Sequence, residues 1–101
     1  MDATLRRLQN WYAANRNGDW EHTYGVKIEN IDNPGWMLTV ELTDTYLQGV
    51  EFSEVRIQRK EETDWIHCNT EKYLFKGACG PYNLEELLLV FLEWAEKEQP
   101  K

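Results

Sequence analysis

Apolar positions along the chain change their spacing twice, from helical to alternating and back to helical. The first set recurs at intervals of three or four residues and comprises Leu5, Leu8, Trp11 and Tyr12. This spacing predicts an amphipathic helix, which Asp2 or Thr4 can cap. The sequence NRNG follows, and Gly18 can adopt the left-handed conformation that ends many helices.

From Tyr24 the period becomes two, which is typical of strands with one face in solvent. The alternating apolar positions are Val26, Ile28, Trp36, Leu38, Val40 and Leu42. The sequence DNPGW interrupts this pattern, and Gly35 after Pro34 fits a type II turn, in which it would take a positive φ. We therefore expect an antiparallel hairpin.

Three further segments complete the predicted fold. Residues 50–62 read as a third strand, and a bulge between Phe52 and Val55 would explain why the apolar parity switches there. Residues 63–77 supply one long strand or two short ones, with Trp65 and Ile66 on opposite faces. The last segment is a helix with an apolar face formed by Leu84, Leu87, Leu88, Phe91, Trp94 and Ala95.

Asn83 and Glu86 have the spacing of a capping box at the start of this last helix. Leu89 falls outside the apolar face, among glutamates. The order of elements predicts an α+β fold: an N-terminal helix, an antiparallel meander of four to five strands and a C-terminal helix, in two layers. A chain of 101 residues indicates a single domain spanning 1–101.

Composition narrows the functional classes. Eighteen acidic residues against eleven basic ones give a net charge of −7, which disfavours nucleic-acid and membrane partners and attracts a basic protein. Acidity that only keeps the protein in solution is the alternative. The N-terminal sequence MDATLRRLQNWYAANR lacks the apolar run of a signal peptide, and two cysteines fit a reducing compartment, so we expect a cytoplasmic protein.

Candidate chemistry is weak. Glu21 and His22 are adjacent with Asp19 close by, and a small hydrolase or ligand-binding domain using Glu21, His22 and Asp32 is one hypothesis. However, neighbours on a strand point to opposite faces, so the first two would not converge. A metal site could draw on His22, His67, Cys68 and Cys79. These residues lack zinc-like spacing, and GACG lacks the residues of a phosphate loop, so we predict no metal, no cofactor and no enzyme.

The remaining candidate is a protein-binding surface. Acidic side chains with aromatic anchors among them suit a protein interface better than a small-molecule pocket. The predicted partner-binding residues are Asp19, Glu21, Glu29, Asp32, Trp36, Glu41, Tyr46 and Leu89. An ordinary hydrated sheet face is the alternative interpretation. We expect a monomer or a weak dimer, and an adaptor or homodimer acting through the last helix is a third hypothesis.

Five sequence blocks carry a family resemblance. They are Trp11-Tyr12, GDWEH at 18–22, YGVKI at 24–28, DNPGW at 32–36 and the late helix from Leu84 to Trp94. In these blocks the chain resembles immunity protein 53, a family of bacterial toxin-immunity proteins. The resemblance implies a small cytoplasmic antitoxin, encoded beside a polymorphic toxin, that binds its own toxin. It implies no catalytic residues, and leaves open whether the toxin is a nuclease with a basic cleft.

Overall fold

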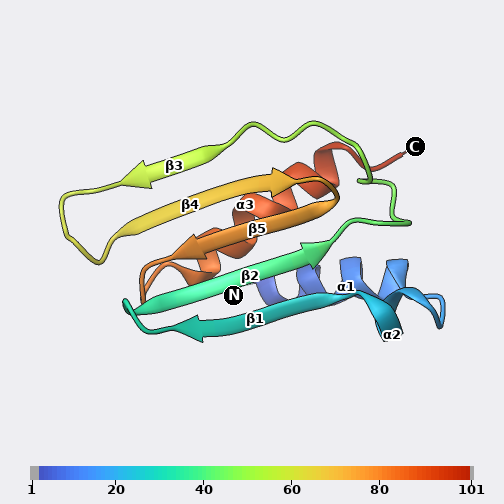
Figure 1. Ribbon diagram of the computed structural model, residues 1–101, viewed down its shortest axis with the longest axis horizontal. Helices are drawn as coiled ribbons and strands as arrows, with labels where there is room; N and C mark the ends of the chain where they lie inside the picture. The colour runs from blue at the N-terminus through green and yellow to red at the C-terminus, as the bar shows by residue number, and fades with distance from the viewer. Residues whose placement is uncertain (1–2, 101) are drawn as a thin grey trace.

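The computed structural model describes residues 3–100 and contains three helices and five strands (Figure 1). In chain order they are α1 (Thr4–Asn15), α2 (Trp20–Thr23), β1 (Val26–Ile31), β2 (Gly35–Glu41), β3 (Val55–Gln58), β4 (Trp65–Glu71), β5 (Leu74–Cys79) and α3 (Leu84–Lys97). The α+β prediction, with a helix at each end and an antiparallel sheet between them, is confirmed.

The strands form one antiparallel sheet in the order β1-β2-β5-β4-β3. The order differs from a plain meander because residues 42–54 carry the chain from β2 to the far edge of the sheet, and β5 returns to the centre beside β2. Helices α1 and α3 pack against each other and lie behind the sheet in Figure 1. One face of the sheet is therefore covered by helices, and the other is open.

The core lies between the sheet and the two long helices. Every second residue of the central strands points into it, including Leu38, Val40, Ile66 and Phe75, each with no exposed surface. From α3, the ring of Phe91 meets Phe75 edge-on, with ring centroids 5.1 Å apart. The apolar residues that recur every second position in the strands and those that recur with helical spacing in α3 thus pack into the same core.

Helix α1 differs from its prediction in the residues that it buries. Thr4 lies inside the helix and is buried, whereas Leu5 is 58% exposed. The alternative cap, Asp2, lies outside the described residues. Gly18 has φ +95°, as the sequence predicted, but it lies beyond the end of α1 in the turn that leads to α2.

The short helix α2 was not predicted, and side chains acting on the backbone explain it. The Asn17 side-chain oxygen accepts hydrogen bonds from the backbone N–H groups of Asp19 and Trp20, both 2.9 Å. Glu21 accepts from the N–H groups of Asn17 and Gly18, both 2.8 Å. These bonds satisfy donors that the chain would otherwise expose on entering the helix. They also orient Trp20, which is 1% exposed, into the core.

The hairpin between β1 and β2 is confirmed, but the reason for its glycine is different. Gly35 pairs with Ile31 and is absent from the residues with positive φ, so the type II turn prediction is wrong. A Cβ at Gly35 would instead overlap the carbonyl oxygen of Cys79 on β5. Glycine is required here because two backbones approach closely.

The segment before β3 also departs from expectation. Residues 50–54 form no strand, so the predicted bulge is wrong, and β3 is only the four residues Val55–Gln58. Side chains anchor the segment to α3: the Trp94 indole donates to the Glu51 carbonyl at 3.1 Å, and Phe52 meets the Trp94 ring. The change of apolar parity therefore marks where an irregular stretch joins a strand.

Candidate protein-binding surface

The open face of the sheet consists of the alternate residues that point away from the helices. The pairing register aligns one row across all five strands: Glu29, Met37, Ala78, His67 and Arg56. The next row contains Lys27, Thr39, Lys76 and Asn69. The half-buried residues Met37, Thr39 and Ala78 therefore lie in the middle of this face beside the charged Lys76, and further charged residues lie on the outer strands.

Two shallow hollows mark the open face. Met37, His67, Lys76 and Ala78 line the first, together with Arg56, which forms an ion pair with Glu54 at 2.8 Å. The second hollow lies towards β1, and its lining includes Tyr24, Lys27, Glu29, Thr39, Glu41 and Leu74. The open face therefore has shallow hollows and charges of both signs, which a protein partner could complement in shape and in charge.

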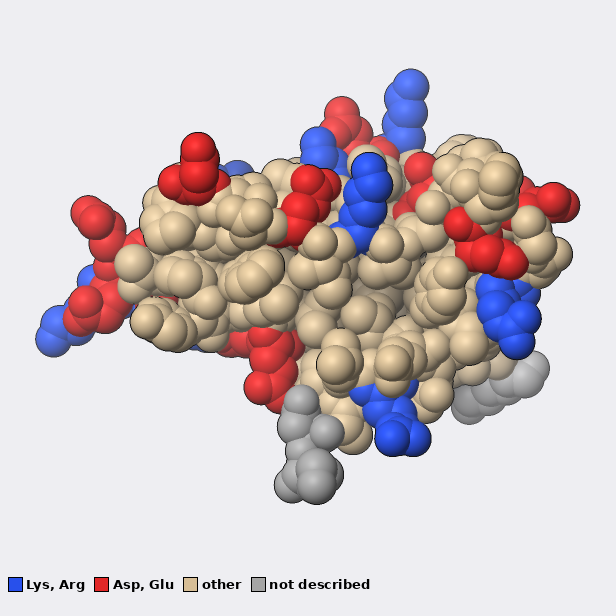
Figure 2. All heavy atoms as spheres, turned by 90° about the horizontal axis from the view of Figure 1, so that it is seen from below, with Lys and Arg blue, Asp and Glu red and all other residues tan. Residues whose placement is uncertain are grey.

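Charges of both signs are present on this side of the molecule. Figure 2 views the protein from the side of β1 and shows acidic and basic side chains interspersed along the upper rim rather than in one field. Across the open face, Lys27, Arg56 and Lys76 accompany four glutamates, and Lys76 pairs with Glu71 at 3.3 Å. Most of the excess of acids therefore belongs to the loops and to α3.

Four of the predicted partner-binding residues have side chains on the surface of the sheet or its turns. Glu29 and Glu41 lie on the open face, on β1 and β2, and line the second hollow. Asp32 is exposed in the β1–β2 turn, and Asp19 is exposed at the start of α2. Since α2 precedes β1 and the turn follows it, Asp19 and Asp32 lie at opposite ends of that strand.

Three other predicted residues have internal roles. The Trp36 indole donates to the Pro81 carbonyl at 3.1 Å, and the ring packs against the core. The Tyr46 hydroxyl accepts from the Trp11 indole at 3.0 Å and donates to the Ala95 carbonyl at 2.7 Å, so it connects α1 to α3. The carboxylate of Glu21 is held by backbone N–H groups, as described above.

Backbone donors also set the acidity of Glu21. The N–H of Glu21 itself, and then those of Asn17 and Gly18, hold the pKa of this carboxyl below its usual value. A general base that works near neutral pH needs the opposite shift. Glu21 is thus a charged, hydrogen-bonded part of the turn, while the adjacent His22 is exposed. The strand geometry expected for these two residues is wrong, because both lie on the short helix α2.

A comparison with protein-family models gives a single description over most of the chain. The model of immunity protein 53 matches residues 5–96. The chain belongs to the immunity protein 53 family. The curated proteins contain no match to it, and neither do the solved structures. The resemblance carried by GDWEH and DNPGW is therefore confirmed.

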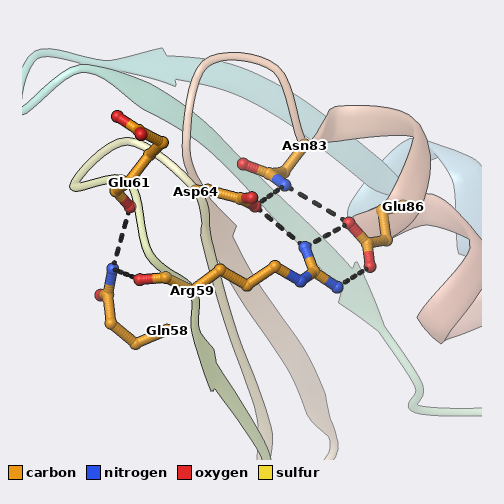
Figure 3. Close-up of polar contacts among 6 residues, drawn as sticks. All are labelled: Gln58, Arg59, Glu61, Asp64, Asn83 and Glu86. Carbon is orange, nitrogen blue, oxygen red and sulfur yellow. Dashed lines mark hydrogen bonds and ion pairs between the residues drawn. The ribbon is translucent and has the colours of Figure 1, made fainter.

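This family member has a polar cluster at one end of the sheet, between the β3–β4 loop and the start of α3 (Figure 3). Arg59, after β3, donates to both carboxylate oxygens of Glu86 on α3 and, at 2.9 Å, to Asp64 before β4. Asn83 donates to Asp64 at 2.9 Å and to Glu86 at 3.3 Å. The cluster fastens the β3–β4 loop to the start of α3.

The cluster changes both the capping and the acidity of its members. Asn83 occupies the N-cap position of α3 but makes no capping bond with its side chain, so the capping-box prediction is wrong in that detail. The bond from Asn83 and then that from Arg59 lower the pKa of Asp64, and Arg59 lowers that of Glu86. The pKa of Arg59 is raised by the same partners.

The remaining candidate groups of this family member lie apart or inside. Cys68 and Cys79 are buried thiols, and burial raises their pKa values to about 12 and about 11. Within residues 3–100, no three His, Cys, Asp or Glu side chains are grouped as metal ligands would be. Over the same residues, no helix is long and apolar enough to cross a membrane. Leu89 lies half-buried on α3.

The open face contains residues that the sequence analysis did not select. His67 is exposed against the ring of Trp65, with ring centroids 5.2 Å apart, and it lies beside Ala78, which pairs with Met37. The alternation of WIHCNTE could have indicated this face, since Ile66 and Cys68 are its buried positions. The predicted contacts were mostly acidic, and the row through Met37, Ala78 and His67 was not among them.

Proposed function

We propose that this protein is a cytoplasmic immunity protein that binds a cognate bacterial toxin and neutralises it by stoichiometric protein–protein inhibition. Membership of the immunity protein 53 family is the observation that carries this proposal. The toxin would be made beside it in a polymorphic toxin system. The protein would act by occupying its partner, with no chemical step of its own.

The arrangement of the polar residues agrees with a binding role. Glu21 and His22 precede β1, and Asp32 follows it. A strand of six residues separates these positions, which corresponds to about 20 Å at the rise of a β-strand. The rival function, a small hydrolase or ligand-binding domain using these three residues, would require them to meet in one pocket.

We assign toxin binding to the open face of the sheet together with the β1–β2 turn. Glu29, Glu41 and Asp32 are the acidic contacts in this proposal, and the hollow around Met37 and His67 would receive apolar or aromatic side chains of the toxin. Asp19 would lie at the margin. The α3 surface around Leu89 is the second candidate surface, while Trp36, Tyr46 and Glu21 would support the fold beneath.

The charge of −7 supports a toxin with a basic cleft, such as a nuclease. Opposite potentials accelerate encounter, so the association rate should fall steeply as ionic strength rises, because salt screens the attraction. Stopped-flow measurement of association across a salt series tests this part. A rate that does not depend on salt would remove electrostatic steering from the proposal while leaving inhibition itself intact.

The test of the function begins with the toxin encoded next to the gene for this protein. Its toxic domain is expressed with and without the immunity protein, and growth of the cells is followed. Protection, and a complex of fixed stoichiometry in calorimetry with the purified pair, are the expected results. Survival that requires turnover of a small molecule in place of complex formation would favour the hydrolase.

The binding surface is tested by charge reversal. Asp32→Lys and Glu41→Lys should each weaken toxin binding about tenfold or more, since each replaces an attraction by a repulsion. Glu98→Lys, which makes the same charge change at the exposed end of α3, is the matched control. Equal affinity for all three variants would move the site away from the open face. Lost binding by a Leu89→Asp variant would then favour the α3 surface.

A further inference from the structure

The outer edge of β1 is an unpaired strand edge. Among residues 3–100, its only neighbour in the sheet is β2, and Lys27, Ile28, Glu29 and Asn30 are all exposed. The pairing with β2 runs from Val26 to Ile31 with no change of register, so no bulge interrupts the edge. Natural sheets usually shorten, twist or cover such edges, because exposed backbone donors and acceptors pair readily with another strand.

The hydrogen-bond pattern identifies which residues offer their backbone at this edge. The Glu41 N–H donates to the Gly25 carbonyl at 3.1 Å. Pairs that exchange hydrogen bonds alternate along an antiparallel ladder, so Gly25, Lys27 and Glu29 turn their backbone groups towards β2. The residues between them, Val26, Ile28 and Asn30, therefore direct N–H and C=O groups outwards.

The sequence of the edge is complementary to itself. If two copies of β1 pair antiparallel with Ile28 opposite Ile28 of the second copy, Val26 lies opposite Asn30, and Lys27 opposite Glu29. All three outward-facing residues then meet in hydrogen-bonded pairs. On the open face, each Lys27 faces a Glu29 of the second copy, and this happens twice because the two-fold axis repeats every contact.

Apolar groups on the helix side fit the same arrangement. Ile28 is 40% exposed, because no strand of the described part of the chain lies beyond it, and the second copy's Ile28 would cover it. Figure 2 views the molecule from this edge and shows a surface whose middle is largely uncharged. Tyr12, on the helix behind the strand, is a further apolar side chain and is 37% exposed.

We propose that the protein forms a two-fold symmetric homodimer in which β1 pairs antiparallel with β1 of a second copy, in the register that sets Lys27 opposite Glu29. The sheet then continues across the two copies. Both ion pairs stand on solvent-exposed positions, and within residues 3–100 neither Lys27 nor Glu29 has an ion-pair partner in the single chain. The inference does not depend on the toxin, because the occupant of the edge is the chain itself.

The experiment is sedimentation velocity of the purified full chain over about a hundredfold range of concentration. The wild-type protein should shift from monomer towards dimer. Lys27→Glu and Glu29→Lys should each weaken the dimer about tenfold, because each converts two attractive cross-strand pairs into repulsive ones. The double variant Lys27→Glu/Glu29→Lys restores both pairs in reversed order, and its dimer constant should return to within about threefold of wild type.

The controls distinguish an effect of the Lys27–Glu29 pairing from an effect of the protein's net charge. Lys60→Glu makes the same charge change as Lys27→Glu in the exposed β3–β4 loop, and it should leave dimerisation unchanged. A chain that stays monomeric at every concentration overturns the proposal, as does a double variant no better than either single variant. If the monomeric chain still binds its toxin and loses that binding through Lys27→Glu, the edge would belong to the toxin instead, which also overturns the dimer.

Discussion

The two faces of the sheet are built from the same strands, yet they follow different rules. On the covered face, Leu38, Phe75 and Ile66 are fully buried against the helices, and each position accepts only an apolar side chain of suitable volume. On the open face, Thr39, Lys76 and His67 occupy the corresponding next positions and remain partly or fully exposed. The period of two thus separates the residues that form the core from those that face solvent, and one face can change while the other is kept.

The largest effect on this comparison should come from removing a ring that packs against the covered face. Phe91→Ala should lower the free energy of unfolding by about 3–5 kcal/mol, because it leaves a cavity between Phe75 and Trp11, whose ring centroids lie 5.1 and 5.0 Å away. Urea unfolding followed by tryptophan fluorescence measures this loss. The control is Tyr82→Ala, since Tyr82 is 92% exposed and its removal should change stability little.

A smaller loss is expected when a partly buried pair of hydrogen bonds is broken without removing a ring. Tyr46→Phe leaves the Trp11 indole and the Ala95 carbonyl without the hydroxyl that joins them, which should cost about 1–3 kcal/mol. Thermal and urea unfolding report it. A variant as stable as wild type would show that water replaces the hydroxyl, and Tyr46 would then be available to a partner.

The polar cluster at the end of the sheet gives a pH-dependent effect. Asp64 and Glu86 have pKa values below their ordinary values of 3.8 and 4.5 in the folded protein, so their stabilisation is present above those values and is lost as the pH falls through the lowered ones. Arg59→Met should therefore destabilise the protein near pH 7, and the difference from wild type should shrink towards pH 3. Urea unfolding at several pH values checks this, and a difference that grows in acid would contradict it.

The smallest effect on stability should come from the open face. Asn69→Ala removes an exposed side chain with no hydrogen bond to another described residue, so its free energy of unfolding should stay within about 0.5 kcal/mol of wild type. Toxin affinity, measured by calorimetry, is the informative readout. A large loss of stability would show that the open face helps to specify the fold and would weaken the separation between the two faces.

The sequence was most informative where the alternating apolar residues are also the buried ones. Alternation from Trp36 to Leu42 predicted β2 and its hairpin, because each buried residue on it faces the core. The segment before Val55 was wrongly predicted as part of a strand. Its apolar residues contact α3 from an irregular backbone, and in the sequence the resulting switch of apolar positions looks the same as a bulge. Gly35 was recognised as special for the wrong reason, because the strand that approaches it lies far along the chain.

The candidate surface was harder to predict for a related reason. Charged residues can be read from the sequence, but whether a carboxylate is already engaged depends on neighbours such as the N–H groups that hold Glu21. Trp36 and Tyr46 looked like interface anchors by composition, and their polar atoms bond inside the protein. The row through Met37, Ala78 and His67 required the strand order, which local patterns do not contain.

The burial of both thiols has a practical consequence. A sulfhydryl that remains protonated and shielded is a poor nucleophile, so maleimides and mild oxidants should leave Cys68 and Cys79 unmodified in the folded protein. A single cysteine placed on the outside would then be the one site to take up a dye. A variant with one added surface cysteine can therefore report distances to its toxin, or to a second copy of itself, while Cys68 and Cys79 are kept.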